Sequence, residues 1–242
     1  VTTLTRDDTK TDWTKIYEAI KTNLDRSNVK PETKKDKLLH QFSIIKDTAI
    51  LNEKNGILGM TPLKYFTIFL KDKLYDSIRF NNSSEDYLGR FYGEFMSYSG
   101  GDGQTLGIVL TPKHITDLFC KLADLKDDDI VLDPCCGTGG FLISAMHEMV
   151  QKIKESNIGE NSKQNKIKNI KQKQLHGIEL QPYMFTIATT NMILRGDGKS
   201  NIINENFLSQ ESGTLQLKQA NVGMMNPPYS QGSSQNSNLY EL

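Results

Sequence analysis

The sequence predicts an α/β protein in which an all-helical block precedes a parallel β-sheet. Apolar residues recur at helical spacing through residues 1–100, whereas short apolar runs alternate with helical segments through residues 101–242. The first of these short runs ends in a cluster of glycines. Strands that alternate with helices are typical of a parallel sheet, so we expect a helical N-terminal domain over residues 1–100 and an α/β domain over residues 101–242.

The composition excludes several classes of protein. The chain has 242 residues, of which 37% are hydrophobic. With its 18 glycines added, the apolar share is roughly 44%, close to the globular average. Its 29 basic residues balance its 29 acidic residues, which excludes a generally basic nucleic-acid coat. No stretch approaches the roughly 18 apolar residues of a membrane span, no signal-peptide core opens the sequence, and the three cysteines form no CxxC pair. We therefore expect a soluble, cytoplasmic protein with no metal site and no membrane partner.

Helical periodicity organises the first hundred residues. Apolar side chains at helical spacing predict helices over residues 13–24 and 38–45. A third helix is predicted to begin with Thr61 as its N-cap and Pro62 at its first position. Ser84 opens a fourth predicted helix. We interpret the apolar stripes of these helices as core rather than as a binding surface.

Residues 93–107 are rich in glycine, and we interpret them as a hinge between domains. The pattern of apolar residues changes after this segment. Thr111 and Pro112 then predict the N-cap and first residue of another helix. Beyond it, apolar runs predict strands at 130–133, 175–180, 202–203 and 222–225, with helices at 141–149 and 183–194.

Residues 151–173 hold seven lysines against two glutamates and few apolar residues. Two interpretations compete. The segment is either a solvated insertion between a helix and the next strand or a basic arm that touches phosphates. We favour the solvated insertion.

The first motif that indicates chemistry is Asp133-Pro-Cys-Cys-Gly-Thr-Gly-Gly-Phe141, where a predicted strand passes into a predicted helix. Glycines at Gly137 and Gly139 allow a sharp turn and a close approach of backbone to a ligand. No lysine follows the glycines, and Asp133 would repel a pyrophosphate, which argues against a phosphate-binding loop. A cofactor with a positive or neutral centre fits this motif better.

The second motif is Glu179, at the end of the next predicted strand. An acid at this place in a parallel sheet commonly holds the ribose hydroxyls of a nucleoside. The separation from Asp133 is 46 residues instead of the usual 20 or so, and the lysine-rich insertion accounts for the excess.

The third motif is Asn226-Pro227-Pro228-Tyr229, directly after the apolar residues 222–225. The prolines fix the backbone and leave carbonyl groups free to accept hydrogen bonds. Asn226 adds an amide oxygen, and Tyr229 adds a flat face for stacking. After a buried strand, the motif indicates a receptor for a planar amine rather than a simple proline turn.

These residues, together with Leu110-Thr-Pro upstream, resemble three motifs of S-adenosylmethionine-dependent adenine-N6 DNA methyltransferases. The resemblance is to the modification subunit of type I restriction-modification systems and to related fused restriction-modification enzymes. It covers residues 85–229 strongly and the helical block loosely. It implies a Rossmann-like, doubly wound methyltransferase sheet behind a helical domain. Members of that family continue for several more strands, so we expect this chain to be a fragment whose sheet is incomplete at the C-terminus.

The resemblance implies a role for each matching residue. Thr111 and Asp133 would hold the methionine part of the cofactor, and Glu179 would bind its ribose. Leu180 and Phe207 would pack against its adenine. The family's usual aspartate before this last position is Asn206 here, with Glu205 as the alternative counterpart. The full expected set is Thr111, Asp133, Gly137, Gly139, Phe141, Glu179, Leu180, Asn206 and Phe207 for the cofactor, and Asn226, Pro227, Pro228 and Tyr229 for catalysis.

The implied reaction transfers a methyl group to an adenine flipped out of double-stranded DNA, without a metal. The implied partners are specificity and restriction subunits or their fused equivalents. Two alternatives remain open, a protein glutamine methyltransferase and a non-catalytic subunit that binds the cofactor for assembly. Cys135 and Cys136 also invite comparison with cytosine-C5 methyltransferases, but they lie in the cofactor loop, so we interpret them as small loop-filling residues.

Overall fold

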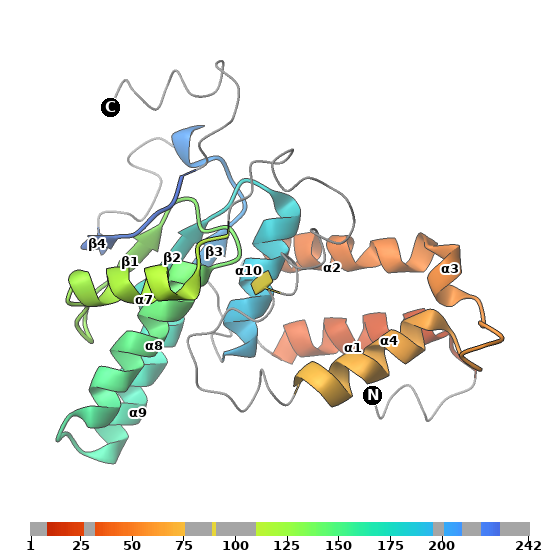
Figure 1. Cartoon of the computed structure of the whole chain (residues 1–242), viewed down its shortest axis with the longest axis horizontal. Helices are drawn as coiled ribbons and strands as arrows, with labels where there is room; N and C mark the ends of the chain where they lie inside the picture. Colours follow the sequence, from red (N-terminus) through yellow and green to blue (C-terminus); the bar gives the residue numbers. More distant parts are fainter. Residues whose placement is uncertain are drawn as a thin grey trace. The chain divides into compact units, whose positions relative to one another are not determined.

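The computed structural model describes residues 9–26, 32–75, 89–90, 110–195, 201–209 and 219–227. It divides the chain into two units, Val1–Asn82 and Ser83–Leu242 (Figure 1). The predicted helix that opens at Ser84, the hinge at 93–107 and the predicted domain boundary after residue 100 lie outside the described residues.

The first unit is built of helices in its described part. These are α1 (Asp12–Arg26), α2 (Glu32–Asp47), α3 (Ala49–Asn52), α4 (Pro62–Leu70) and a π-helical turn, Lys71–Tyr75. The helices predicted over 13–24, 38–45 and from Pro62 are therefore confirmed, whereas α3 has no counterpart in the prediction. Contacts join α1 to α2 and to α4, and the buried apolar residues in the described part of this unit are Leu24, Leu38, Leu39 and Leu63. Phe66 and Phe69 of α4 are exposed, so the prediction that the whole apolar stripe is core is wrong for them.

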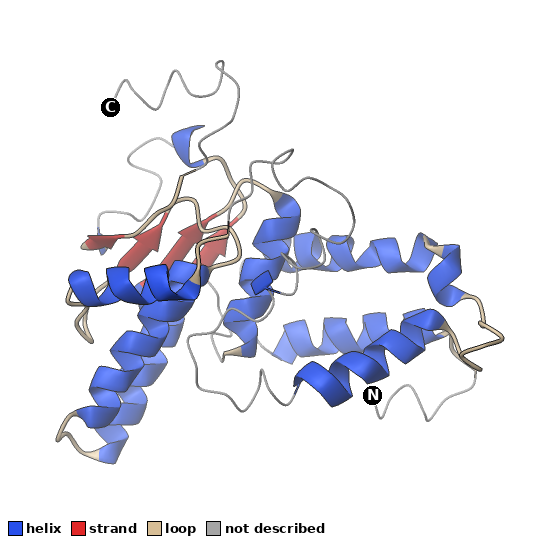
Figure 2. Cartoon of the chain, in the orientation of Figure 1, coloured by secondary structure: helices blue, strands red, loops and turns tan. Residues whose placement is uncertain are grey.

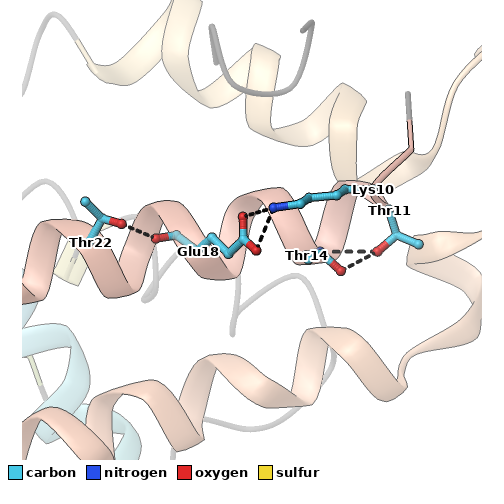
Figure 3. Close-up of polar contacts among 5 residues, drawn as sticks. All are labelled: Lys10, Thr11, Thr14, Glu18 and Thr22. Atoms are coloured by element: carbon cyan, nitrogen blue, oxygen red, sulfur yellow. Dashed lines mark hydrogen bonds and ion pairs between the residues drawn. The ribbon is translucent and has the colours of Figure 1, made fainter. Parts of the chain in front are cut away.

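Polar side chains fix the start of α1 (Figure 3). The Thr11 hydroxyl accepts a hydrogen bond from the backbone N–H of Thr14 at 3.3 Å, as an N-terminal capping group does. Lys10 pairs with Glu18 across two turns at 2.9 Å, and the Thr22 hydroxyl donates to the Glu18 carbonyl. These contacts are exposed, so they define the helix end more than they stabilise the unit.

The second unit contains a parallel sheet (Figure 2). Its described strands are β1 (Val131–Asp133), β2 (Leu175–Ile178), β3 (Asn201–Ile203) and β4 (Val222–Gly223), in the order β3-β2-β1-β4. All neighbouring pairs are parallel, with Asp133 opposite Gly177 and Leu132 opposite Gly223. The predicted strands and their parallel direction are thus confirmed. The order reverses at β1, which makes the carboxyl ends of β1 and β4 the switch point where parallel sheets bind ligands.

Helices connect the strands in the order that the sequence predicts. They are α7 (Lys113–Leu122), α8 (Gly140–Glu155), α9 (Glu160–Asn169), α10 (Pro182–Leu194), a π-helical turn (Ile170–Gln174) and a 3-10 turn (Phe207–Ser209). Helix α8 contacts α7, β1 and β2, and α10 contacts β3. The side chains of Leu142, Ile143, Met149, Leu175 and Met192 are among those fully buried between these elements.

Helix α7 begins one residue later than predicted. Pro112, not Thr111, is the N-cap, and its carbonyl accepts from the backbone N–H of Ile115 and Thr116. Its buried residues are Thr116 and Cys120, whereas the apolar residues Leu118, Phe119 and Leu122 are exposed. Thr111 is therefore free of a capping role and available for another.

The lysine-rich segment continues α8, turns, and returns as α9, which contacts α8 (Figure 1). Four of its lysines bind the protein itself: Lys152 donates to the Leu125 carbonyl, Lys163 donates to the Lys154 carbonyl, Lys166 pairs with Asp127, and Lys171 donates to the Arg195 carbonyl. The loop between β1 and α8, residues 134–139, is called the glycine loop. Because α8 begins at the glycine loop and runs away from it, the turn to α9 lies far from that loop. This arrangement favours the solvated insertion.

Candidate functional site

The glycine loop joins β1 to α8 through two glycines in the left-handed backbone region. Gly137 has φ 54° and Gly139 has φ 88°, values that residues with a Cβ rarely adopt. Gly139 is the N-cap of α8, and its N–H donates to the Cys136 carbonyl at 2.7 Å. The prediction that these glycines serve a sharp turn is confirmed.

A second contact fastens the same loop to β2. The backbone N–H of Cys136 donates to the Ile178 carbonyl at 3.0 Å, and the Cys136 side chain is buried. A Cβ added at Gly177 would lie 2.9 Å from the Cys136 sulfur and 2.9 Å from Leu142 Cδ1. Gly177 is thus a site residue that sequence reasoning missed, because a glycine inside a strand shows its reason only when the packed loop is seen.

Glu179 ties the end of β2 to the glycine loop. Its Oε2 accepts from the backbone N–H of Gly137 at 2.8 Å, and its Oε1 accepts from that of Gln181 at 2.7 Å. Asp133 and Glu179 therefore stand at the carboxyl ends of neighbouring strands, as predicted. The carboxylate of Glu179 is held in a fixed orientation at the loop.

The two acids share an environment that disfavours their charges. Burial raises the pKa of Asp133 to about 7, and the neighbouring charge of Glu179 adds to this, while the N–H of Cys135 opposes it by donating to Asp133 Oδ1 at 3.1 Å. Burial also raises the pKa of Glu179. Within the described residues neither acid is in a salt bridge. A cationic ligand would relieve this accumulation of negative charge.

The cysteines of the loop are poor nucleophiles. Burial raises the pKa of Cys135 to about 11 and that of Cys136 well above its ordinary value, and the two nearby acids raise both further. A cysteine nucleophile needs its thiolate form, which these sites disfavour. The described residues also contain no group of three side chains placed to hold a metal ion.

The segment after β3 lies beside Glu179. The Asn204 side chain donates to the carbonyls of Glu179 and Leu180, both at 2.9 Å, and the Glu205 N–H donates to the Glu179 carbonyl. Asn206 Oδ1 accepts from the Leu208 N–H at 3.0 Å, which caps the short 3-10 turn.

Three expected cofactor contacts differ in their surroundings. Leu180 is 47% exposed and Phe207 is partly exposed, so both offer apolar surface. Phe141 is buried, with its ring 5.6 Å from the Phe119 ring, which gives it a packing role between α8 and α7. The assignment of these three residues to a cofactor stays a prediction.

The asparagine of the third motif meets the threonine that precedes the N-cap of α7. Asn226 Nδ2 donates to Thr111 Oγ1 at 3.0 Å, which joins residues 115 positions apart in sequence. Asn226 follows β4 and Asp133 ends β1, which are neighbouring strands. Pro228 and Tyr229 lie outside the described residues. The structure thus brings Thr111, Asp133, Glu179 and Asn226 to the carboxyl edge of the sheet.

Anchor residues of the surrounding elements keep this edge in place. The buried Asn191 of α10 donates to the Thr138 carbonyl of the glycine loop at 2.9 Å.

No helix of the described residues has the length and apolar character to cross a membrane.

The sequence model of one protein family, N-6 DNA Methylase, matches residues 83–241. Among curated proteins, the chain is 46% identical over 233 residues to the type II restriction enzyme and methyltransferase RM.BcgI of Heyndrickxia coagulans, covering 96% of this chain and 35% of that protein. It is 28% identical over 156 residues to the EcoEI methylase subunit of a type I restriction enzyme of Escherichia coli, covering 64% of this chain and 30% of that subunit.

Among solved structures, a nuclease-deletion mutant of the type ISP restriction-modification enzyme LlaGI with a DNA substrate mimic matches with a TM-score of 0.49 and 16% identity. The match covers 83% of this chain and 18% of that one. The chain spans about a third of the length of the curated relatives named above.

Proposed function

Because the chain belongs to the N-6 DNA methylase family, we propose that it forms the cofactor-binding part of a DNA adenine-N6 methyltransferase of a restriction-modification system. The observation that carries the proposal is the meeting of Asn226 with Thr111 at the same sheet edge as Asp133 and Glu179. In the proposal Asn226 is the acceptor for a target amine, and the acids that hold the methyl donor stand at the ends of neighbouring strands.

The residues at this edge fit S-adenosylmethionine. The cofactor carries a positive sulfonium and an ammonium group, which suit two buried acids without a salt bridge in the described part of the chain. Gly137 leaves open space where its Cβ would be, so the backbone can be approached closely. In the proposal Asp133 and Thr111 hold the methionine part, Glu179 accepts from the ribose, and Leu180, Asn206 and Phe207 surround the adenine.

When bound, S-adenosylmethionine supplies an activated methyl group on a positively charged sulfur. Asn226 Oδ1 and the Pro227 carbonyl accept hydrogen bonds from the two N–H groups of the target amine. These bonds favour a more nucleophilic geometry at its nitrogen in the transition state. Tyr229 stacks on the flipped base and offsets part of the cost of unpairing it, a few kcal/mol. The acceptors are neutral, so the proton that the amine loses goes on to solvent.

The names of the relatives support a proposal for the substrate and the partners. Their names describe restriction enzymes and methylase subunits, so we propose double-stranded DNA as the substrate and restriction and specificity functions as partners, on separate subunits or on one chain. We also propose that the sheet belongs to a Rossmann-like, doubly wound methyltransferase fold. In the same proposal the helical unit is a domain of such an enzyme.

Transfer of tritiated methyl groups from S-adenosylmethionine tests the function, with the protein at its native length and with DNA or peptide as acceptor. We expect label in DNA at adenine N6. Label in glutamine of a peptide would instead support a protein methyltransferase, and calorimetric binding without any transfer would support an assembly subunit.

Substitution of Asn226 gives a sharper prediction. Asn226→Ala should abolish methyl transfer and leave cofactor affinity near normal, because its oxygen is assigned to the base. Tyr229→Ala should cost less, about 1–3 kcal/mol of stacking, and Tyr229→Phe should keep most of the rate. A Tyr229→Phe variant as damaged as Asn226→Ala would show that the hydroxyl takes part in the chemistry.

A further inference from the structure

The contact between Asn226 and Thr111 has a consequence for the orientation of the asparagine amide. We propose that Thr111 is a positioning residue that holds Asn226 with Oδ1 turned to the target amine, an inference that rests on the proposed function. Its basis is the single hydrogen bond from Asn226 Nδ2 to Thr111 Oγ1 at 3.0 Å.

Thr111 is held in place by the helix that follows it. The Pro112 carbonyl accepts from the first turn of α7, and α7 is fastened to α8 through buried hydroxyls. The hydroxyls of Thr116 and Ser144 lie 2.7 Å apart, and Ser144 donates to Asp117 at 2.9 Å. The position of Thr111 therefore depends on α7 and α8, not on Asn226.

Asn226 is held independently by the sheet. The Met224 N–H donates to the Leu132 carbonyl at 2.9 Å, and Val222 pairs with β1. Pro227 follows, and a proline restricts the residue before it to extended backbone. The backbone that carries Asn226 is therefore held by the sheet, and the hydrogen bond to Thr111 decides which way the side-chain amide is turned.

That rotation decides what the asparagine offers. An amide presents an oxygen acceptor on one side and two N–H donors on the other. With Nδ2 bound to Thr111, the oxygen faces away from Thr111, and among the described residues it accepts no hydrogen bond. The reverse orientation would present N–H groups to an amine that itself donates, so it could not receive the amine's hydrogens.

The threonine hydroxyl can enforce this choice. It accepts from Asn226 through a lone pair, which leaves its own hydrogen free to donate. In the proposed function that hydrogen goes to the carboxylate of the methionine part, so the hydroxyl then offers Asn226 an acceptor alone. Thr111 thereby serves the cofactor and the target amine with different atoms of one hydroxyl group.

The rate test uses the protein at its native length with saturating cofactor and DNA, in single-turnover methyl transfer. Thr111→Val keeps the shape of the side chain and removes the hydroxyl, and we expect the rate to fall about 10- to 100-fold. Thr111→Ser should recover most of that loss, since it restores the hydroxyl. Thr22→Val, which removes a hydroxyl bonded within α1, is the matched control and should leave the rate near that of the parent protein.

A Thr111→Val rate equal to that of the parent protein at saturating cofactor would overturn the inference, because Thr111 would then serve cofactor binding alone. A second measurement does not depend on turnover. The side-chain amide signals of Asn226, identified by their absence in Asn226→Ala, should shift in the NMR spectrum of Thr111→Val and return toward the parent position in Thr111→Ser.

Unmoved amide signals in a folded Thr111→Val protein would also overturn the inference. If the parent protein transfers no methyl group to DNA, the proposed function fails. The amide signals still show whether Thr111 and Asn226 are hydrogen-bonded, so a failure of the proposed function is distinguished from a failure of the contact that the inference rests on.

Discussion

Asp133 is an acid that the fold holds where its ionisation is costly. Burial raises its pKa to about 7, whereas aspartate in an unfolded chain ionises near 3.9. Between these pH values the folded protein binds the proton more tightly than the unfolded chain does. The resulting stability is fully present below pH 4 or so and is lost as the pH rises through about 7.

Asp133→Asn tests this at the residue scale. The substitution removes the titrating group and leaves an oxygen that can still accept from the Cys135 N–H. We expect the free energy of unfolding to decline less between pH 5 and pH 8 in the variant than in the parent protein. Denaturant unfolding across this range measures the difference, and Glu179 is retained in both proteins.

The same variant separates a binding role from a structural one. Under the proposed function, affinity of the parent protein for S-adenosylmethionine rises by up to about tenfold per pH unit toward pH 7, since the carboxylate is the binding form. In Asp133→Asn the affinity should be weaker and flat across this range. Parallel pH profiles for the two proteins would refute the role of Asp133 toward the cation.

Gly177 is a residue whose importance is steric. Any side chain there meets the Cys136 sulfur and Leu142, both buried. We expect Gly177→Ala to destabilise the protein by about 1–3 kcal/mol, as overpacking of a core does. Chemical denaturation measures the loss.

Gly223 is the matched control for that substitution. It also lies in a strand, it is exposed, and a Cβ built on it meets nothing within 4 Å. Gly223→Ala should therefore change the unfolding free energy by less than about 0.5 kcal/mol. Equal losses at the two glycines would mean that backbone freedom, not the clash with Cys136, sets the effect.

At the scale of a single element, α4 shows how a helix start is made. The Thr61 hydroxyl accepts from the Lys64 N–H at 3.1 Å and donates to Asp12 Oδ2 at 2.6 Å, and Pro62 occupies the first helical position. One side chain thus caps α4 and ties it to the start of α1. Thr61→Ala should cost about 0.5–2 kcal/mol of stability, which thermal or chemical unfolding detects.

Thr48 provides the comparison within the same unit. It is the N-cap of α3 but makes no capping hydrogen bond with its side chain, because its hydroxyl donates to the Ile44 carbonyl. Thr48→Ala should be milder than Thr61→Ala. The opposite ranking would contradict the capping and cross-helix roles assigned to Thr61.

Across the whole molecule, the sequence predicts those features that depend on short segments of the chain. The strand before Asp133, the turn at Gly137 and Gly139, and the acid at Glu179 were predictable, because strand periodicity and glycine conformation are properties of short segments. The start of α7 is displaced by one residue from the prediction, because Thr111 and Pro112 both suit a helix end and the structure makes Pro112 the N-cap.

Other features depend on distant parts of the chain. The solvated insertion at residues 151–173 carries no predicted helix over residues 160–169, which form α9, because contact with α8 and the buried Ile170 that follows stabilise a helix with few apolar residues. The need for glycine at residue 177 and the bond between Thr111 and Asn226 likewise arise from segments far apart in sequence. Contacts between distant segments leave no local pattern in a single sequence from which they could be predicted.

The distribution of the site over one unit leads to a prediction for the whole chain. Every described residue assigned to the cofactor lies within Ser83–Leu242. A ligand stabilises the segments whose opening would release it, by about 2.7 kcal/mol at a concentration 100 times its Kd. We expect S-adenosylmethionine to slow hydrogen exchange at the backbone amides of Cys135, Gly137 and Gln181, which donate to Asp133 and Glu179.

Exchange in α1 and α4 should change little, because none of their residues is assigned to the cofactor. Hydrogen exchange followed by mass spectrometry resolves the two units in a single experiment. Asn226→Ala is the control, since the proposal gives Asn226 to the target base and predicts the same protection in that variant. Protection that spread equally over both units, or that vanished in Asn226→Ala, would place the cofactor elsewhere and would remove the acids at the ends of β1 and β2 from its site.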